Sequence, residues 1–359
     1  MDVKTHFKDK LSNLLFLQMN KERVENIFNT RLYVNEAIYM PVATEDIVKK
    51  VKNNENVDTI PVAFFVEGMI YVLGADDDFK YNDIYEELVL NAPKGIEFIK
   101  GRIASYVKEK KYEDAYIMLK GLVKLEPTEE IYSKLIMLAE KLRSLNKDYT
   151  EEELEVIEKA KEIEGYAIPY LYEAEIKRDK EDFYGALFSI NNYIAKGGEE
   201  TPEISEFKSS LKVVNGYDEG KKLVYDEPKK ALEILLPLLD ELSDNPEVYY
   251  YIAVAYRLIE NNHKAIYYLE KSIEIDSSYP EVFNELGINY ACVEDFESAI
   301  VYLRKVFEAT RSIEVCTNLI MCYMNIGDYK QAKIHLEIAN KIDSEDEIVK
   351  ELNNILKDA

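Results

Sequence analysis

Tryptophan is absent from this chain, and glycine, proline and cysteine are scarce: its 359 residues include 13 Gly, 10 Pro and 3 Cys. Sheet-rich folds need frequent turn residues, whereas helical arrays need few, so the scarcity of glycine and proline favours an all-α fold. Three cysteines are too few, and odd in number, for a disulfide framework. A secreted, disulfide-stapled domain is therefore excluded.

The sequence also lacks a hydrophobic run that suits a membrane. The longest apolar stretch, residues 60–75, is shorter than the roughly 18 residues a membrane helix needs, and it contains Glu67. Lysine and aspartate interrupt residues 1–20, so no signal-peptide pattern is present. We therefore expect a cytoplasmic protein. Lysine outnumbers arginine 37 to 8, a bias that suits an AT-rich bacterial genome.

Basic residues are outnumbered, with 45 Lys and Arg against 69 Asp and Glu, for a net charge of −24. Residues 1–60 carry nine acids and nine bases, so the whole excess lies in residues 61–359. An acidic surface repels phosphate backbones and anionic lipid headgroups, which argues against nucleic acid and membrane partners. A basic or apolar segment of a protein or peptide fits better.

What the sequence does contain is an internal repeat in its last third. PEVYYYIAVAY begins at Pro246 and PEVFNELGINY begins at Pro280, which is 34 residues later, and a third unit starts near Ile313. The apolar and small residues recur at matching positions. They are Tyr249, Ile252, Ala253, Tyr256, Ala265 and Leu269 in the first unit, Phe283, Leu286, Gly287, Tyr290, Ala299 and Leu303 in the second, and Leu319, Tyr323, Ala332 and Leu336 in the third.

This spacing predicts pairs of antiparallel helices. Each unit presents an apolar stripe at helical spacing, and Asp244-Asn245-Pro246-Glu247 is typical of a helix start. Ala253 and Gly287 stand where two helices approach closely. Because each pair leaves an apolar face uncovered, the pairs are stable only when they stack.

The three units resemble the tetratricopeptide repeat, in its bacterial type. This resemblance implies an all-α, right-handed superhelical solenoid of antiparallel helix pairs. Weaker matches suggest about eight units between Pro61 and Asp346. We expect four regions: a helical cap or small helical domain at 1–60, degenerate repeats at 61–245, three clear repeats at 246–346 and a capping helix at 347–359. Residues 197–205 are the best candidate for a hinge or long loop.

Two of these regions rest on helical spacing alone. In the N-terminal cap the spaced residues are Phe7, Leu11, Leu14, Leu15, Val24, Ile27 and Phe28, and in the capping helix they are Ile348, Leu352, Ile355 and Leu356.

Catalytic and metal-binding patterns are missing. His6, His263 and His335 are far apart and share no motif, and Cys316 and Cys322 are spaced for different faces of one helix. Neither a GxxxxGK nor a GxGxxG phosphate loop occurs. We therefore expect no enzyme activity, no cofactor and no metal.

In the tetratricopeptide family the first helices of successive units line a concave groove, and the resemblance places the partner-binding residues there. By matching position they are Tyr250, Val254, Arg257, Asn284, Ile288, Ala291, Thr317, Met321 and Met324. Glu247, Glu281 and Glu314 form a column beside them, facing either the helix dipole or a basic ligand. One subfamily holds acidic chaperone tails with a Lys, Asn and Arg clamp, but Tyr250, Val254, Glu285 and Glu314 stand at those positions. Chaperone-tail binding is therefore excluded.

Two functions fit this sequence. The first is a non-catalytic scaffold or adaptor that binds a protein or peptide in the groove. The alternative is a tetratricopeptide-type receptor whose peptide ligand regulates a signalling or transcription partner. A catalytic Gln, Glu or Asp on an N-terminal helical bundle would favour the receptor, but residues 1–60 are too short for a full bundle.

Overall fold

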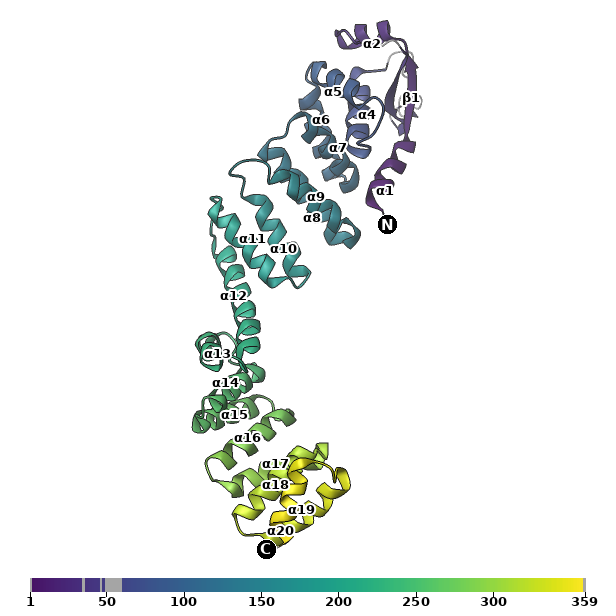
Figure 1. The fold of residues 1–359 in the computed structure, drawn as a ribbon. Coiled ribbons are helices and arrows are strands. Elements are labelled where there is room, and N and C mark those ends of the chain that lie inside the picture. Colours follow the sequence, from purple (N-terminus) through teal and green to yellow (C-terminus); the bar gives the residue numbers. More distant parts are fainter. Residues whose placement is uncertain (1, 34–35, 46, 49–59, 358–359) are drawn as a thin grey trace. The chain divides into compact units, whose positions relative to one another are not determined.

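The computed structural model describes residues 2–33, 36–45, 47–48 and 60–357, and it consists mainly of α-helices (Figure 1). The chain divides into two compact units, Met1–Ser205 and Glu206–Ala359. The division falls in the first turn of α12 (Pro202–Leu223), at the end of the predicted loop 197–205. The predicted all-α architecture of packed helix pairs is confirmed, whereas the four regional boundaries stay predictions.

The first unit contains two strands and a series of helices. Its strands are β1 (Leu14–Met19) and β2 (Ile38–Ala43), and its helices are α1 (Val3–Lys10), α2 (Lys21–Phe28), α4 (Val62–Ala75), α5 (Asn82–Asn91), α6 (Gly95–Lys108), α7 (Tyr112–Leu125), α8 (Glu129–Leu145), α9 (Thr150–Ala160), α10 (Ile168–Asp179) and α11 (Phe183–Ala195). Short 3₁₀ turns, η1 (Leu11–Asn13) and η2 (Lys147–Tyr149), follow α1 and α8.

Helix α4 is the centre of the first unit. It is apolar on every side, and residues 65–75 are all buried, which identifies the long hydrophobic stretch of the sequence as a core helix. It packs against α7, α5, α6 and β2. Among the described residues, no helix combines the length and the apolarity that crossing a bilayer requires.

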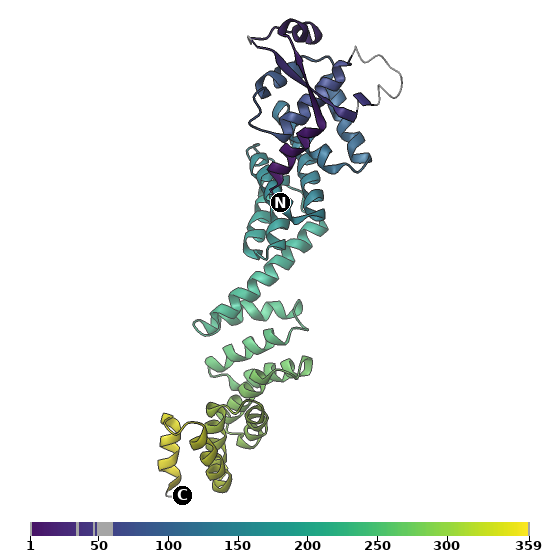
Figure 2. The same ribbon diagram turned by 90° about the vertical axis from the view of Figure 1, so that its right-hand side faces the viewer.

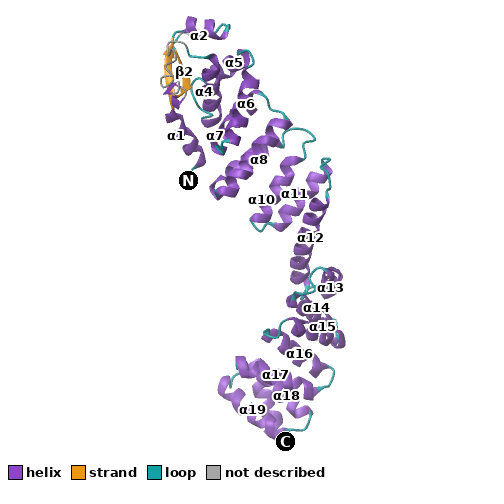
Figure 3. Ribbon diagram, turned by 180° about the vertical axis from the view of Figure 1, so that it is seen from behind, coloured by secondary structure: helices purple, strands orange, loops and turns teal. Residues whose placement is uncertain are grey.

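The N-terminal region is only partly the helical cap that its spacing predicted. Strands β1 and β2 pair antiparallel, with Leu14 opposite Ala43 and Met19 opposite Ile38, and they lie beside α4 (Figure 3). Leu14 and Leu15, expected on a helix, are therefore on a strand. A short apolar run such as LLFLQM fits either structure, and pairing with β2 decides for the strand. Residues 49–59 of the predicted cap lie outside the described residues.

Residues from this N-terminal region share one hydrophobic core with the helices that follow. Phe7, Val24, Phe28 and Met40 are at most 1% exposed and belong to the same cluster as the core of α4 to α9. Phe7 packs its ring against Tyr116 at a centroid distance of 5.7 Å. The described part of residues 1–60 is therefore integrated into the first unit.

Glu113 ties α1 to α7 and η2. It accepts hydrogen bonds from Lys10 at 2.9 Å and from Tyr149 at 2.6 Å, and His6 lies 3.3 Å away. Burial by itself raises the pKa of Glu113, but the hydrogen bonds from Tyr149 and Lys10 outweigh it and lower the pKa to about 2.

A Glu113→Gln variant is expected to lose stability in a pH-dependent way. A carboxyl whose pKa falls on folding adds stability above its ordinary pKa, and this contribution disappears as the pH falls through the folded value. We expect a loss of about 1–2 kcal/mol at pH 7, discounted because the side chain is 35% exposed, and a clearly smaller loss at pH 2.5, where the contribution is already declining towards the folded pKa. Urea unfolding at both pH values measures it, and an equal loss at both would contradict this role.

The second unit is a run of helices joined by short turns. They are α12, α13 (Pro228–Leu235), α14 (Pro246–Leu258), α15 (Asn262–Ile275), α16 (Pro280–Cys292), α17 (Phe296–Thr310), α18 (Ile313–Asn325), α19 (Tyr329–Ile342) and α20 (Glu347–Lys357), with a 3₁₀ turn η3 (Leu236–Asp240) after α13. From α14 to α20 each helix packs against the next (Figure 2). The first helices of the three repeats begin at Pro246, Pro280 and Ile313, as the sequence predicts.

The turn inside each repeat has one recurring conformation. Glu260, Glu294 and Gly327 occupy equivalent positions between the paired helices and all have φ between 62° and 77°. The next residue caps the following helix: the side chains of Asn261, Asp295 and Asp328 accept a hydrogen bond from the backbone N–H three positions later. In the first unit Lys110 and Glu181 repeat the positive φ in the turns α6–α7 and α10–α11. The repeat therefore extends beyond its clearest sequence matches.

Close helix approach occurs where the sequence places small residues. Ala253 is fully buried, and a Cβ added at Gly287 would lie closer than 3.0 Å to the side chain of Leu303 on α17. At the end of the unit, α20 buries Val349, Leu352 and Leu356. The predicted face of this helix was partly wrong, because Ile348 and Ile355 are 45% and 50% exposed. Its axial rotation is set by contact with α19.

Candidate functional site

The predicted groove lies on the first helices of the three repeats. Helices α14, α16 and α18 contact one another in sequence, so matching positions on them form rows across the second unit. One row is Tyr250, Asn284 and Thr317, and a second row one turn further is Val254, Ile288 and Met321. The third row consists of Arg257, Ala291 and Met324.

Two of the predicted groove residues are core residues. Val254 is 0% exposed and belongs to a core cluster shared with α13, which packs against α14. Thr317 is 1% exposed, and its hydroxyl donates a hydrogen bond to the carbonyl oxygen of Glu314. Neither side chain is available to a partner on this surface. Along the second row exposure rises from Val254 through half-buried Ile288 to Met321, which is 38% exposed.

The groove's single arginine is used within the fold. Arg257 on α14 donates to both carboxylate oxygens of Glu285 on α16, at 2.7 and 3.3 Å. This ion pair links the first helices of adjacent repeats. Asn284 is half-buried, and among the described residues its Oδ1 has no hydrogen-bond donor.

An apolar pocket of about 300 Å³ lies between α16 and α18. Its lining includes the predicted residues Ile288, Ala291 and Met321, together with Gly287, Cys292, Phe296, Leu303, Asn318, Cys322 and Asn325. Methionine adapts to differently shaped apolar side chains. This pocket suits an apolar side chain of a bound segment. The amides of Asn318 and Asn325, which also line the pocket, suit hydrogen bonds to the backbone of that segment.

A second cavity, the tyrosine cleft, lies at the first of the three repeats. It measures about 380 Å³ and is lined by Lys221, Tyr225, Glu247, Tyr250, Tyr251, Tyr279 and Glu281. Of these, only Tyr250 was among the predicted groove residues. Tyr225 and Tyr279 lie in the connections before α13 and α16, so periodicity along a helix could not have found them.

The predicted column of glutamates sits in the first turns of α14, α16 and α18. Negative charge is favourable there because the amino end of a helix is electropositive. Glu247 also accepts hydrogen bonds from Tyr217 at 2.5 Å and Tyr279 at 2.7 Å, and these two bonds lower its pKa. A carboxylate is thereby fixed at the edge of the tyrosine cleft.

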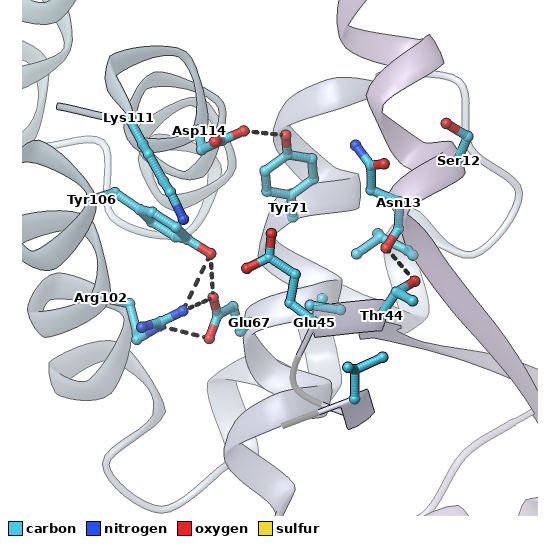
Figure 4. A pocket seen from close by; sticks show the side chains of 14 residues that line it. Ser12, Asn13, Thr44, Glu45, Glu67, Tyr71, Arg102, Tyr106, Lys111 and Asp114 are labelled. Carbon is cyan, nitrogen blue, oxygen red and sulfur yellow. Dashed lines mark hydrogen bonds and ion pairs between the residues drawn. The ribbon is translucent and has the colours of Figure 1, made fainter. Parts of the chain in front are cut away.

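The first unit has a cavity of about 500 Å³ beside β1, α4, α6 and α7, which the sequence did not predict (Figure 4). Glu67 forms a bidentate ion pair with Arg102, at 2.8 and 2.7 Å, and accepts a hydrogen bond from Tyr106 at 2.7 Å. Tyr71 donates to Asp114 at 2.7 Å. The charged groups in this cavity are therefore largely paired with one another. The one sequence signal for it was Glu67, the lone charge in an apolar stretch.

The described residues were compared with the requirements of a metal site and of a reactive cysteine. No group of three His, Cys, Asp or Glu side chains there is arranged to hold a metal ion. Cys316 and Cys322 are buried, and burial raises the pKa of both thiols to about 11. His335 packs against Tyr323 and makes a hydrogen-bond contact of 2.9 Å with the carbonyl oxygen of Gln331.

Residues 246–279, which form α14, α15 and the turn to α16, match the model of the tetratricopeptide repeat. This segment is a tetratricopeptide repeat. The matched segment is the first of the three predicted clear repeats and contains Tyr250 and Glu247. No curated protein matches the chain as a relative.

Solved structures resemble this chain only distantly. One is the MamA protein, at 21% identity and a TM-score of 0.37, with 49% of this chain and 90% of that chain covered. Another is PilW, a type IV pilus biogenesis factor, at 15% identity and a TM-score of 0.36, with 62% and 97% covered. A third is the C-terminal part of a TPR repeat-containing protein from Cytophaga hutchinsonii, at 14% identity and a TM-score of 0.38, with 70% and 98% covered.

Proposed function

We propose that this tetratricopeptide-repeat protein is a non-catalytic scaffold that binds a segment of another protein across α14, α16 and α18. The observation that carries the proposal is the occurrence of two cavities on these helices, the tyrosine cleft and the apolar pocket. Tyr250 lines the first and Ile288 the second, and these residues stand in adjacent rows of one face. An extended peptide or an amphipathic helix has the length to reach both.

The chemistry of this face supports recognition of a protein segment. Tyrosine contributes large contact area at low entropic cost, and methionine adapts to the ligand. The unit around it is acidic, since residues 206–359 contain 29 acidic and 17 basic residues. A basic or apolar segment is the partner that this surface favours, and we place the protein in the cytoplasm of a bacterium.

A face variant with Tyr250→Ala, Asn284→Ala and Met321→Ala is expected to lose its partner by at least tenfold in recovered amount. Tyr250→Ala and Met321→Ala each remove contact area at a cavity, and Asn284→Ala removes a half-buried amide from α16 on the same face. Truncating a few central contacts typically costs more than about 1.4 kcal/mol of binding energy, or tenfold. The measurement is a pull-down from lysate of the native host, compared by mass spectrometry with the wild-type chain.

The repeats provide a matched control on their second helices. Tyr267, Val301 and Ile334 occupy equivalent positions on α15, α17 and α19 and are 55%, 56% and 42% exposed. Changing these three to alanine removes similar area elsewhere in the same repeats and should leave capture intact. The opposite result would be that the control loses the partner and the face variant keeps it, with helical circular dichroism unchanged in both. That result would place the binding surface on the second helices.

The receptor alternative is favoured by no specific contact in the described residues. The described residues among 3–43 form two short helices and a two-stranded sheet instead of a helical bundle. We therefore retain the scaffold as the proposed function, and the same face would serve a peptide ligand if the pull-down recovers no protein.

A further inference from the structure

The tyrosine cleft has walls suited to a flat or cationic group. Tyr250 and Tyr251 meet edge to face at a centroid distance of 5.2 Å, and Tyr225, which also lines the cleft, is 63% exposed. Aromatic faces carry negative electrostatic potential and attract cations that lie over them. The cleft is open to solvent at Tyr225 and partly buried at Tyr250, so a long side chain reaches its interior from the surface.

Two carboxylates complete the cleft. Glu247 is held by hydrogen bonds from Tyr217 and Tyr279, which orient its carboxylate and favour its ionised form. Glu281, in the first turn of α16, is exposed at the same cavity. Aromatic rings with fixed negative charge at their edge are the combination that binds an ammonium or guanidinium group.

The protein's own Lys221 shows how a cation fits there. Its Nζ lies 4.9 Å from the centroid of the Tyr251 ring, 5.7 Å from that of Tyr217, and 3.7 Å from the carboxylate of Glu247. The lysine side chain is 42% exposed, so it reaches these groups across the open side of the cleft and is not locked in the core. It demonstrates, within one chain, the contacts that a partner's basic side chain would make.

We propose that the tyrosine cleft is a subsite for a basic side chain, best an arginine, of the bound segment, and that Lys221 competes with that side chain. This inference rests on the proposed function, since it names the part of the partner that the first repeat recognises. Guanidinium stacks on aromatic rings and pairs with carboxylate more readily than ammonium, so an arginine displaces the lysine. The apolar pocket at α16 and α18 then takes an apolar residue of the same segment.

The test uses a single charged probe, because an acidic protein attracts any polycation. N-acetyl-arginine methylamide is titrated into the full chain carrying ¹³C-labelled tyrosine, with N-acetyl-citrulline methylamide as the uncharged control of the same shape. The arginine probe is expected to shift the ring signals of Tyr225, Tyr250, Tyr251 or Tyr279, whereas the citrulline probe leaves them in place.

Lys221→Met keeps the aliphatic stem and removes the competing charge. We expect it to strengthen binding of the arginine probe about fivefold, the equivalent of one exposed cation–π contact. Tyr225→Ala should abolish the response, and Tyr267→Ala, which removes a similarly exposed tyrosine outside the cleft, should not. A gain of affinity is a result that a purely structural role for Lys221 would not produce.

The outcomes separate this inference from the proposed function. Equal responses to both probes, or no response in either the wild type or Lys221→Met, would remove the arginine subsite. If the face variant still loses its partner in the pull-down, the scaffold proposal stands without that subsite. If the face variant keeps its partner while the arginine probe binds, the scaffold face is wrong and a cation site alone remains.

Discussion

Gly74→Ala is expected to lower the free energy of unfolding of the first unit by about 3 kcal/mol or more. A Cβ at this position would lie closer than 3.0 Å to the backbone of Ile117 and Gly121 on α7. Backbone atoms cannot rotate away as a side chain does, so α4 and α7 must separate along the core. Gly121 faces the same contact from the other side, since a Cβ there would approach the carbonyl oxygen of Ile70.

The control is a glycine in a neighbouring helix with open space around it. No heavy atom lies within 4 Å of a Cβ built at Gly101 in α6. Gly101→Ala should therefore stabilise the unit by about 0.5–1 kcal/mol, because alanine has less backbone freedom to lose in a helix. Urea unfolding followed by circular dichroism measures both variants. If Gly74→Ala unfolds at the wild-type midpoint, the close α4–α7 packing is wrong.

Arg143→Met is expected to destabilise the first unit by about 3–5 kcal/mol at pH 8. Arg143, at the end of α8, donates to Glu153 at 2.7 Å and to Asp179 at 2.6 Å. Glu153 is 0% exposed, and its second carboxylate oxygen has no donor among the described residues. Removal of the arginine leaves a buried charge without compensation.

The cost of that substitution should depend on pH. Burial raises the pKa of Glu153 from its ordinary value to about 7, although Arg143 acts in the opposite direction. A carboxyl with a raised pKa favours the folded state below its ordinary pKa and loses that advantage as the pH rises through the folded value. Without Arg143 the folded pKa rises further, so the penalty shrinks as the pH is lowered below 7.

Thermal unfolding at pH 8 and pH 5.5 measures this dependence. The double variant Arg143→Met, Glu153→Gln removes the charge together with its partner and should recover part of the stability at pH 8. A single variant that is equally destabilised at both pH values, with no recovery in the double variant, would show that Arg143 acts through its packing alone.

The three clear repeats are the part of the fold that the sequence predicts best. Their first helices start at Pro246, Pro280 and Ile313, and Gly287 meets Leu303 as a close-approach residue should. These features depend on contacts within about 34 residues, which a periodic pattern records directly. The structure also shows the positive-φ turn of the repeat. This turn recurs at positions such as Lys110, where the residue is not glycine.

Features that depend on distant segments could not be predicted in this way. Strand β1 needs β2 as its partner. Because 18 residues separate Met19 from Ile38, a pattern read along a short stretch of sequence does not show this pairing. Val254 matches the predicted groove row, but it is 0% exposed and belongs to a core cluster that includes residues of α13. The tyrosine cleft draws Tyr225 and Tyr279 from connections and Lys221 from α12, three places with no shared spacing.

Site-specific photo-crosslinking in the native host tests the central claim most directly. A photoreactive phenylalanine analogue is placed at Met321, in the apolar pocket, and separately at Val301, which is 56% exposed on α17. We predict that irradiation joins one discrete protein or peptide to position 321 and none to position 301. A crosslinked partner at position 301 with none at 321 would contradict binding across α14, α16 and α18.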